Sequence, residues 1–194
     1  MMENIKADLQ RYYKNNSRSL NPSVKEKIKI IGENYGVHAI FVYRFGYFIE
    51  SIINDKKLNL IKQLLLGAYY MLNFFVIKMY DIRINRKAKI GKGLYITHFG
   101  GIVISNCILG EHCTVNQRAQ IEGDDFSSNE ELCHIGDNVW IGPHAIIKKG
   151  IKIGDGATIA AGAVIRADVE KQCLALGNPA RIVNKNYDNS ILNV

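Results

Sequence analysis

Apolar residues recur at helical spacing through the first 80 residues of the chain. Asn21 followed by Pro22 is a favourable helix start, and the runs that follow place apolar side chains three or four positions apart. The three apolar stripes consist of Val24, Ile28 and Ile31; of Val37, Phe41, Phe45, Phe48 and Ile52; and of Leu60, Leu64, Ala68, Leu72, Phe75 and Met79. The sequence therefore predicts three amphipathic helices. The segment Leu64 to Ile77 is apolar enough for a buried or membrane-interfacial helix.

The spacing changes to six from Ile84 onward. Aliphatic anchors stand at Ile84, Ile90, Ile96 and Ile102, then at Leu109, Val115 and Ile121, and again at Ile135, Ile141, Ile147, Ile153, Ile159 and Ile165. Neither a helix nor an alternating strand has this period, whereas the stacked rungs of a parallel β-helix do. We therefore expect a mainly β fold, a left-handed parallel β-helix of hexapeptide repeats, preceded by an α-helical N-terminal region.

Three hexads make one triangular coil, so each anchor can be assigned to a coil. We expect the coils 84/90/96, 103/109/115, 121/135/141 and 147/153/159, with 165 opening the last. The domain organisation that follows is a helical region over residues 1–80, a β-helix over residues 81–183 and a tail over residues 184–194. Residues 122–134 interrupt the repeat and are expected to form an excursion loop.

The charge is divided unevenly along the chain. Residues 1–93 contain 17 Lys and Arg against 7 Asp and Glu, a net charge of +10, whereas residues 94–194 contain 8 against 11, a net charge of −3, and the two sum to +7. The basic half is either a solvated helix surface or a surface for anions such as lipid headgroups and phosphates. Because no nucleic-acid-binding motif accompanies it, we expect no nucleic acid partner.

The cysteines and the N-terminus indicate a cytoplasmic protein. The four cysteines include no CxxC pair, so we expect neither a disulfide framework nor a structural zinc site. The first 20 residues contain no long apolar run, so we expect no secretory signal.

One histidine stands inside the repeat, in the run GLYITHFGGIVIS. If one face stacks Ile96, Val115, Ile141 and Ile159, the positions two residues later form a column of His98, Gln117, Pro143 and Ala161. Rungs lie about 4.8 Å apart, so this column extends about 14 Å, which suits an extended thiol-bearing arm. A neutral imidazole can take a proton from a hydroxyl and return it to a thiolate. The alternative is a histidine that only caps a turn.

Three motifs carry a family resemblance: AKIGKGLYITHFGGIVIS, HIGDNVWIGPHAIIKKGIKIGDGATIAAGAVI and ALGNPARIV. Over residues 84–183 the chain resembles the hexapeptide-repeat acetyltransferases, in the serine acetyltransferase-like branch, and GVHAIFVYRFGYFI resembles that branch's N-terminal region. The resemblance implies an acetyl-CoA-dependent O-acetyltransferase that forms a homotrimer with active sites between neighbouring β-helices. It also implies that His98, in an H-x-x-G-I-V motif, is the catalytic general base.

The acceptor side departs from the pattern of the serine acetyltransferases. The resemblance implies an aspartate in a D-I-H-P segment, where this chain has Arg83-Ile84-Asn85-Arg86, and an Arg-His pair where it has Glu131 and Leu132. We therefore expect a sugar hydroxyl as acceptor, in capsule, exopolysaccharide or O-antigen synthesis, as for the polysaccharide-associated proteins of this branch. The alternatives are a serine O-acetyltransferase of cysteine biosynthesis and a non-catalytic trimeric scaffold.

Further site residues are assigned by position. Asp124, Asp125 and Gln117 are candidates to orient His98 or to bind the acceptor. The resemblance implies approach of the pantetheine arm of acetyl-CoA at four small residues, and four basic residues are candidates for the CoA phosphates. These eight are Gly123, Pro143, Ala160 and Ala161, and Lys148, Lys149, Arg166 and Arg181. Each charged residue could instead be ordinary surface charge.

A metal enzyme on the same fold, the γ-type carbonic anhydrase, needs three converging histidines, two of them closely spaced. His98, His112, His134 and His144 include no pair five residues apart, so we expect no metal. We expect a cytoplasmic location, with peripheral contact to anionic lipid at the inner face of the membrane as a hypothesis from the basic, apolar helical half.

Overall fold

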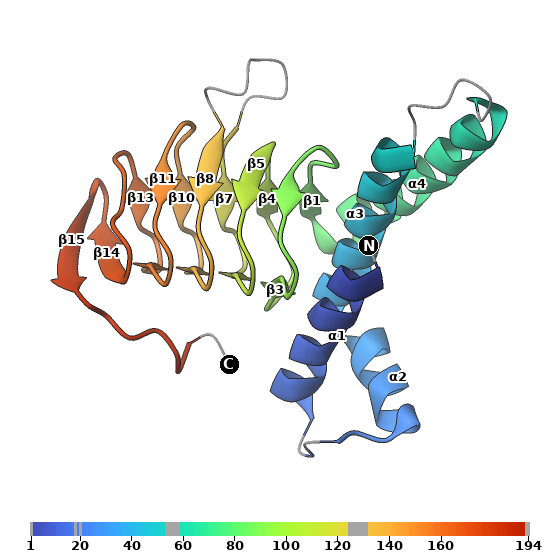
Figure 1. Ribbon diagram of the computed structural model, residues 1–194, viewed down its shortest axis with the longest axis horizontal. Coiled ribbons are helices and arrows are strands. Elements are labelled where there is room, and N and C mark those ends of the chain that lie inside the picture. Colours follow the sequence, from blue (N-terminus) through green and yellow to red (C-terminus); the bar gives the residue numbers. More distant parts are fainter. Residues whose placement is uncertain (1, 18, 20, 53–58, 124–131, 193–194) are drawn as a thin grey trace.

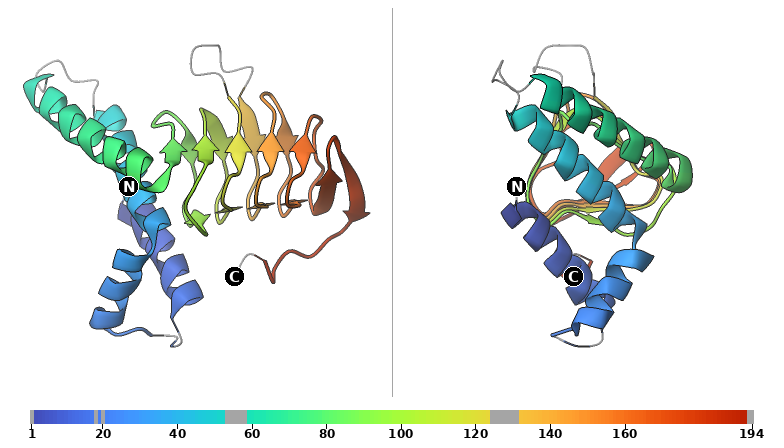
Figure 2. Two further views of the ribbon diagram at one scale, coloured as in Figure 1. Left: turned by 180° about the vertical axis from the view of Figure 1, so that it is seen from behind. Right: turned by 90° about the vertical axis from the view of Figure 1, so that its right-hand side faces the viewer.

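The computed structural model describes residues 2–17, 19, 21–52, 59–123 and 132–192. Its helices precede its strands in the chain and lie across one end of a prism of stacked strands (Figures 1 and 2). The helices are α1 Met2–Asn16, α2 Val24–Glu33, α3 Tyr35–Ile52 and α4 Asn59–Tyr80.

The helical region contains one helix more than the apolar stripes predicted. Helix α1 buries Asp8, Arg11 and Tyr12, and a polar buried face of this kind leaves no aliphatic stripe to read in the sequence. The predicted stripe of α2 is also misplaced, since Val24 is 73% exposed and Ile30 is the buried residue at 4%. Which helix side chains are buried depends on the backbone groups that the β-prism presents to them. The periodicity of the helix sequence does not contain that information.

Helix α4, predicted to be a buried or membrane-interfacial helix, exposes its apolar stripe. Tyr69 and Val76 are its buried side chains and face α3, whereas most of the predicted stripe points to solvent. The exposed large apolar residues of α4 are Leu60, Ile61, Leu64, Tyr70, Met71, Leu72, Phe74, Phe75 and Met79. The segment Leu60–Tyr80 is long and apolar enough to cross a membrane. Its most apolar 18-residue stretch has a mean hydropathy of 1.5, and 11% of that stretch is buried.

The strands build a parallel β-solenoid with three faces. Its elements are β1 Ile82–Ile84, β2 Lys89–Ile90, β3 Tyr95–Ile96, β4 Ile102–Ile104, β5 Cys107–Leu109, β6 Thr114–Val115, β7 Gln120–Ile121, β8 Cys133–Ile135, β9 Trp140–Ile141, β10 Ile146–Ile147, β11 Lys152–Ile153, β12 Thr158–Ile159, β13 Val164–Ile165, β14 Cys173–Gly177 and β15 Ala180–Lys185. The sheets have the orders β1-β4-β7-β10-β13, β11-β8-β5-β2 and β15-β14-β12-β9-β6-β3. Only the last pair, β14 and β15, is antiparallel among the described strands. The predicted fold class is confirmed.

The predicted coil assignment is correct on one face and wrong on another. Ile96, Val115, Ile141 and Ile159 stack in register as expected. On the face of β1, however, Ile84 pairs with Ile104 rather than with residue 103, and Val103 points outward. Ile96 to Ile104 spans eight positions, where Val115 to Ile121 spans six. The corner that contains His98 is therefore two residues longer than the corner below it.

Polar side chains of the helices attach them to the first coils. Arg11 donates from Nη1 to the carbonyl oxygens of Gly93 and Cys113, at 2.8 and 2.9 Å. The Tyr12 hydroxyl donates to the Ile96 carbonyl oxygen at 2.9 Å and accepts from the Ile96 N–H at 3.0 Å. The bonds to Gly93 and Ile96 satisfy backbone groups of the first coil, which has no further coil above it, so the helices close the open end of the solenoid.

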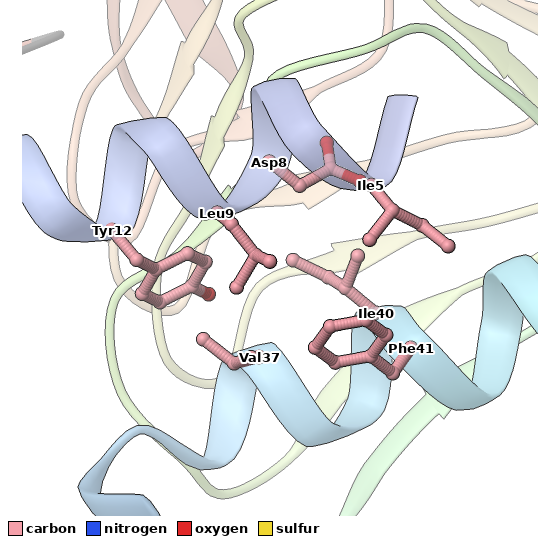
Figure 3. Close-up of a pocket in the computed structure, with 7 residues that line it drawn as sticks. All are labelled: Ile5, Asp8, Leu9, Tyr12, Val37, Ile40 and Phe41. Atoms are coloured by element: carbon pink, nitrogen blue, oxygen red, sulfur yellow. The ribbon is translucent and has the colours of Figure 1, made fainter. Parts of the chain in front are cut away.

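A buried ion pair completes this junction. Arg44 donates to both carboxylate oxygens of Asp8, at 3.0 and 3.2 Å, and to the carbonyl oxygens of Ile90 and Gly91, while Asp8 accepts the Leu94 N–H at 2.9 Å. The residues around Asp8 on α1 and α3 are otherwise apolar (Figure 3). The cavity between them measures about 10 Å³, which makes it a packing seam rather than a binding site.

Candidate active site

The longer corner between β3 and β4 presents His98 and Phe99 to solvent. Gly100 and Gly101 follow with φ angles of 99° and 67°, in the region that disfavours side chains. His98 is exposed, and Phe99 is 57% exposed with its ring 5.2 Å from that of Tyr35 on α3. The two extra residues therefore carry the imidazole away from the prism and against the helical region.

Backbone and side-chain bonds fix this corner. The Gly100 N–H donates to the Tyr80 carbonyl oxygen at 2.9 Å, and the Gly101 N–H donates to Asp81 Oδ2 at 3.0 Å. Thr97 Oγ1 donates to Asn116 Oδ1 at 3.0 Å on the other side. The end of α4 and the second coil thus hold the turn on both flanks of His98.

A cavity of about 360 Å³ lies beside His98, between the first coil and the helical region. The helical region contributes Asn16, Glu33, Asn34, Tyr35 and Gly36, and the coil contributes Tyr95, Thr97, His98 and Phe99. This volume accommodates a small acceptor molecule next to the imidazole. No sequence pattern indicates the helical wall, because its residues belong to the ends of α1 and α2 and the start of α3, which only the tertiary fold brings to His98.

The predicted column runs along the same corner of the prism. Gln117, Pro143 and Ala161 occupy the positions that follow the stacked residues Val115, Ile141 and Ile159. Gln117 Oε1 is buried and has no hydrogen-bond partner within the described ranges. Ala161 is exposed, so the strip ends in small residues that leave room for a ligand along it.

No carboxylate of the described residues hydrogen-bonds the His98 ring. Asp124 and Asp125, the loop candidates for this role, lie outside the described residues, as does Glu131. Arg83, in the position of the family's aspartate, points outward from β1 and pairs with Asp81 at 3.4 Å. Asp81 contacts the turn of His98 by accepting the Gly101 N–H. It was not among the predicted site residues because it lies two residues before Arg83, the position aligned with the aspartate.

The other predicted donor-site residues are spread along the prism. Lys148 Nζ binds Glu122 Oε1 at 2.6 Å, which engages it in an ion pair. Gly123 lies where an added Cβ would meet the Asn106 carbonyl oxygen at 2.4 Å, so its lack of a side chain serves backbone packing. Lys149, Arg166 and Arg181 are exposed and Ala160 is partly exposed. Gln117, Pro143, Ala160 and Ala161 are the predicted residues that share the corner of His98.

Burial raises the pKa of several acidic groups in the core. It raises the pKa of the Cys107 and Cys113 thiols to about 12, so neither is a nucleophile at neutral pH. Burial also raises the pKa of the Asp8 carboxyl above its ordinary value, although the bonds from Arg44 favour the charged form. Across the described ranges, no three side chains of the His, Cys, Asp or Glu type come together as a metal site.

Comparison with known proteins supports the transferase class. Residues 132–167 match the family model for bacterial transferase hexapeptide (six repeats). A serine acetyltransferase of Synechococcus elongatus is 25% identical over 164 residues, covering 84% of this chain and 63% of the relative. A serine acetyltransferase of Staphylococcus aureus is 28% identical over 166 residues, covering 85% and 73%. The chain thus spans less than two thirds of the length of the cyanobacterial relative.

The solved structures show the same resemblance. The crystal structure of Neisseria gonorrhoeae serine acetyltransferase superposes with a TM-score of 0.74 at 25% identity, covering 95% of this chain and 67% of that one. These matches overturn the expected sugar acceptor and the polysaccharide-associated branch, because the relatives are serine acetyltransferases. The chain is a hexapeptide-repeat β-solenoid whose relatives in sequence and in structure are serine acetyltransferases.

Proposed function

We propose that this protein transfers the acetyl group of acetyl-CoA to the hydroxyl of L-serine, with His98 as general base. The observation that carries the proposal is the place of His98 at the mouth of a cavity of about 360 Å³, on a chain whose relatives are serine acetyltransferases. The activity belongs to relatives longer than this chain, and the shared part covers 84% and 85% of this chain in the two relatives.

The chemistry requires one base and two substrates held together. The imidazole accepts the hydroxyl proton as the serine oxygen attacks the thioester carbonyl carbon. The tetrahedral intermediate collapses, the carbon–sulfur bond breaks, and the leaving thiolate takes the proton from His98, giving O-acetylserine and CoA. Holding the hydroxyl and the thioester at one site supplies much of the rate, because a bimolecular encounter becomes a local one.

The corner strip suits the donor. A pantetheine amide N–H directed at Gln117 Oε1 would supply the hydrogen bond that this buried oxygen lacks. Ala161, about 14 Å from His98 by rung spacing, keeps the strip open farther along. Exposed Arg166 and Arg181, at the far end of the prism, are the proposed contacts for the CoA phosphates. Lys149 and, after release from Glu122, Lys148 are further proposed contacts.

We also propose that the protein assembles as a homotrimer and works in the cytoplasm. Light scattering should then give about 65 kDa, three times the 21.8 kDa of one chain. A monomer that retains full activity would contradict a site shared between neighbouring solenoids.

Helix α4 supports a proposed peripheral contact with anionic lipid. Its nine exposed large apolar residues exceed what a solvated helix normally presents, and the first 93 residues carry a net charge of +10. The protein should float with vesicles that contain phosphatidylglycerol and remain behind with neutral phosphatidylcholine vesicles. Absence from both floating fractions would exclude the contact.

The decisive experiment measures thiol release from acetyl-CoA with and without L-serine. The wild type should release CoA only with serine, and mass spectrometry should identify O-acetylserine. His98→Ala should lower kcat by about 10² to 10⁴, the usual contribution of a general base. His134→Ala is the matched control, an exposed histidine on another face of the prism, and should retain full activity.

Three outcomes would contradict the proposal. Serine-independent thiol release would mean hydrolysis rather than transfer, and no release with any acceptor would favour the scaffold. Full activity of His98→Ala would exclude the imidazole as base.

A further inference from the structure

The polar groups of the cavity beside His98 are mainly hydrogen-bond acceptors. Glu33 supplies a carboxylate, and Asn16 and Asn34 supply amide groups from the ends of α1 and α2. No lysine or arginine is among the described residues that line it. Such a wall favours a ligand that brings donors and a positive charge.

The two amides are oriented by their own helices. Asn16 Nδ2 donates to the Tyr12 carbonyl oxygen at 2.9 Å, and Asn34 Nδ2 donates to the Ile30 carbonyl oxygen at 2.7 Å. Because each NH₂ group is anchored in this way, each amide can present its oxygen to a ligand as an acceptor, although Asn34 keeps one N–H donor. Tyr95 differs from the two amides, since its hydroxyl oxygen accepts from Asn16 at 3.4 Å and its O–H remains a donor.

Glu33 is held only loosely by the protein. Its one ion pair is with Lys29, at 3.8 Å on the same helix, and the two side chains are 65% and 70% exposed. An exposed pair of this kind contributes little, so the carboxylate can exchange Lys29 for a ligand cation at small cost.

We propose that Glu33 binds the ammonium group of the acceptor and thereby selects hydroxyl compounds that carry an amine. The proposal rests on the proposed function for the chemistry at His98 and adds the acceptor side of the same cavity. An amino alcohol placed with its hydroxyl at the imidazole directs its ammonium toward the helical wall, where Glu33 is the carboxylate. Because the helix ends supply this carboxylate, binding of the ammonium group does not require an aspartate at position 83, where this chain has Arg83.

The test compares acceptors with and without an amine. Glu33→Gln should raise the KM for L-serine about tenfold or more, as expected for the loss of one charge-assisted hydrogen bond. It should leave kcat, and the KM for acetyl-CoA, unchanged. With 3-hydroxypropionate, which lacks the amine, wild type and Glu33→Gln should have the same KM.

Glu170→Gln is the matched control, because Glu170 is 69% exposed and pairs with Lys185 at 3.5 Å at the far end of the prism. It should behave as wild type with every acceptor. An unchanged serine KM in Glu33→Gln, or an equal rise with 3-hydroxypropionate, would overturn the proposal.

A second pair of acceptors tests the role of Glu33 independently of the proposal that serine is the acceptor. If serine is not acetylated, ethanolamine should still be preferred over ethylene glycol, and Glu33→Gln should remove the preference. If no acceptor turns over, L-serine should still shift protein NMR signals in the wild type and not in Glu33→Gln. Equal responses of the two proteins would overturn the role of Glu33.

Discussion

Replacing Asp8 by alanine tests whether the helical region is held on the solenoid by its buried ion pair. The substitution removes both hydrogen bonds to Arg44 and the acceptor of the Leu94 N–H. Arg44 remains 2% exposed and always charged, so it becomes a buried cation whose remaining hydrogen bonds, among the described residues, go to the carbonyl oxygens of Ile90 and Gly91.

The expected cost follows from this uncompensated charge. Removing one partner of a buried ion pair lowers the free energy of unfolding by about 3 to 5 kcal/mol. For a domain of this size, each kcal/mol lowers Tm by about 2 to 4 °C, so Asp8→Ala should lower Tm by about 6 to 20 °C. Because α1 also carries Asn16, the KM for the acceptor should rise before global unfolding is reached.

Thermal unfolding followed by circular dichroism measures the effect. Lys6→Ala, an exposed position on the same helix, is the control and should change stability by less than about 0.5 kcal/mol. Replacing both partners, in Asp8→Leu with Arg44→Met, should recover part of the loss, since no buried charge remains. A decrease in Tm of less than about 3 °C in Asp8→Ala would refute the reasoning, because the pair would then contribute no more than a surface ion pair.

The remaining predictions concern the turn, the donor strip and the cysteines. Asparagine, like aspartate, tolerates the φ of 49° at position 81, but Asp81→Asn removes the negative charge that accepts the Gly101 N–H. The kcat should therefore fall about three- to tenfold, with an unchanged KM for acetyl-CoA. An unchanged kcat would show that Asp81 does not help to position His98. Gln117→Leu should raise the KM for acetyl-CoA about fivefold, as expected for one neutral hydrogen bond, and an unaltered KM would exclude this strip as the donor site. Because burial raises the pKa of the Cys107 and Cys113 thiols to about 12, Ellman's reagent at pH 8 should detect them only after denaturation, and rapid labelling of the folded protein would contradict their burial.

The solenoid could be predicted from the sequence because each rung repeats the same local requirement. An aliphatic anchor every six residues fills the interior, and the register of Ile96, Val115, Ile141 and Ile159 follows from counting. The relatives were recognised for the same reason, but the acceptor was not. The sugar acceptor was predicted from two departures from the serine acetyltransferase motifs, at Arg83 and near Leu132. Those departures were given more weight than the similarity of the whole chain, although other residues can bind an acceptor.

The helical region was predicted less well because its buried face is polar. Asp8, Arg11 and Tyr12 are buried because they bind backbone groups of the first coils, and those partners lie more than 80 positions away in sequence. For α4 the sequence left a buried and a membrane-interfacial helix open, since only the position of α3 determines that Tyr69 and Val76 are covered while the apolar stripe is exposed. Periodicity indicates that a helix has two faces, and the tertiary fold determines which one is buried.

The site arises where the regularity of the repeat ends. Corners at Gln117 and Pro143 keep six-residue spacing and are stacked between neighbouring coils, so their side chains lie against the prism. The corner of His98 has two more residues and faces helices instead of a further coil, which places the imidazole at a cavity with a helical wall. A base needs both an approach for its substrate and a fixed position. The long corner supplies the approach, and the bonds from Tyr80 and Asp81 supply the fixed position. Shortening this corner by the two glycines should therefore abolish transfer while leaving the solenoid intact, because the rungs below it hold their own register.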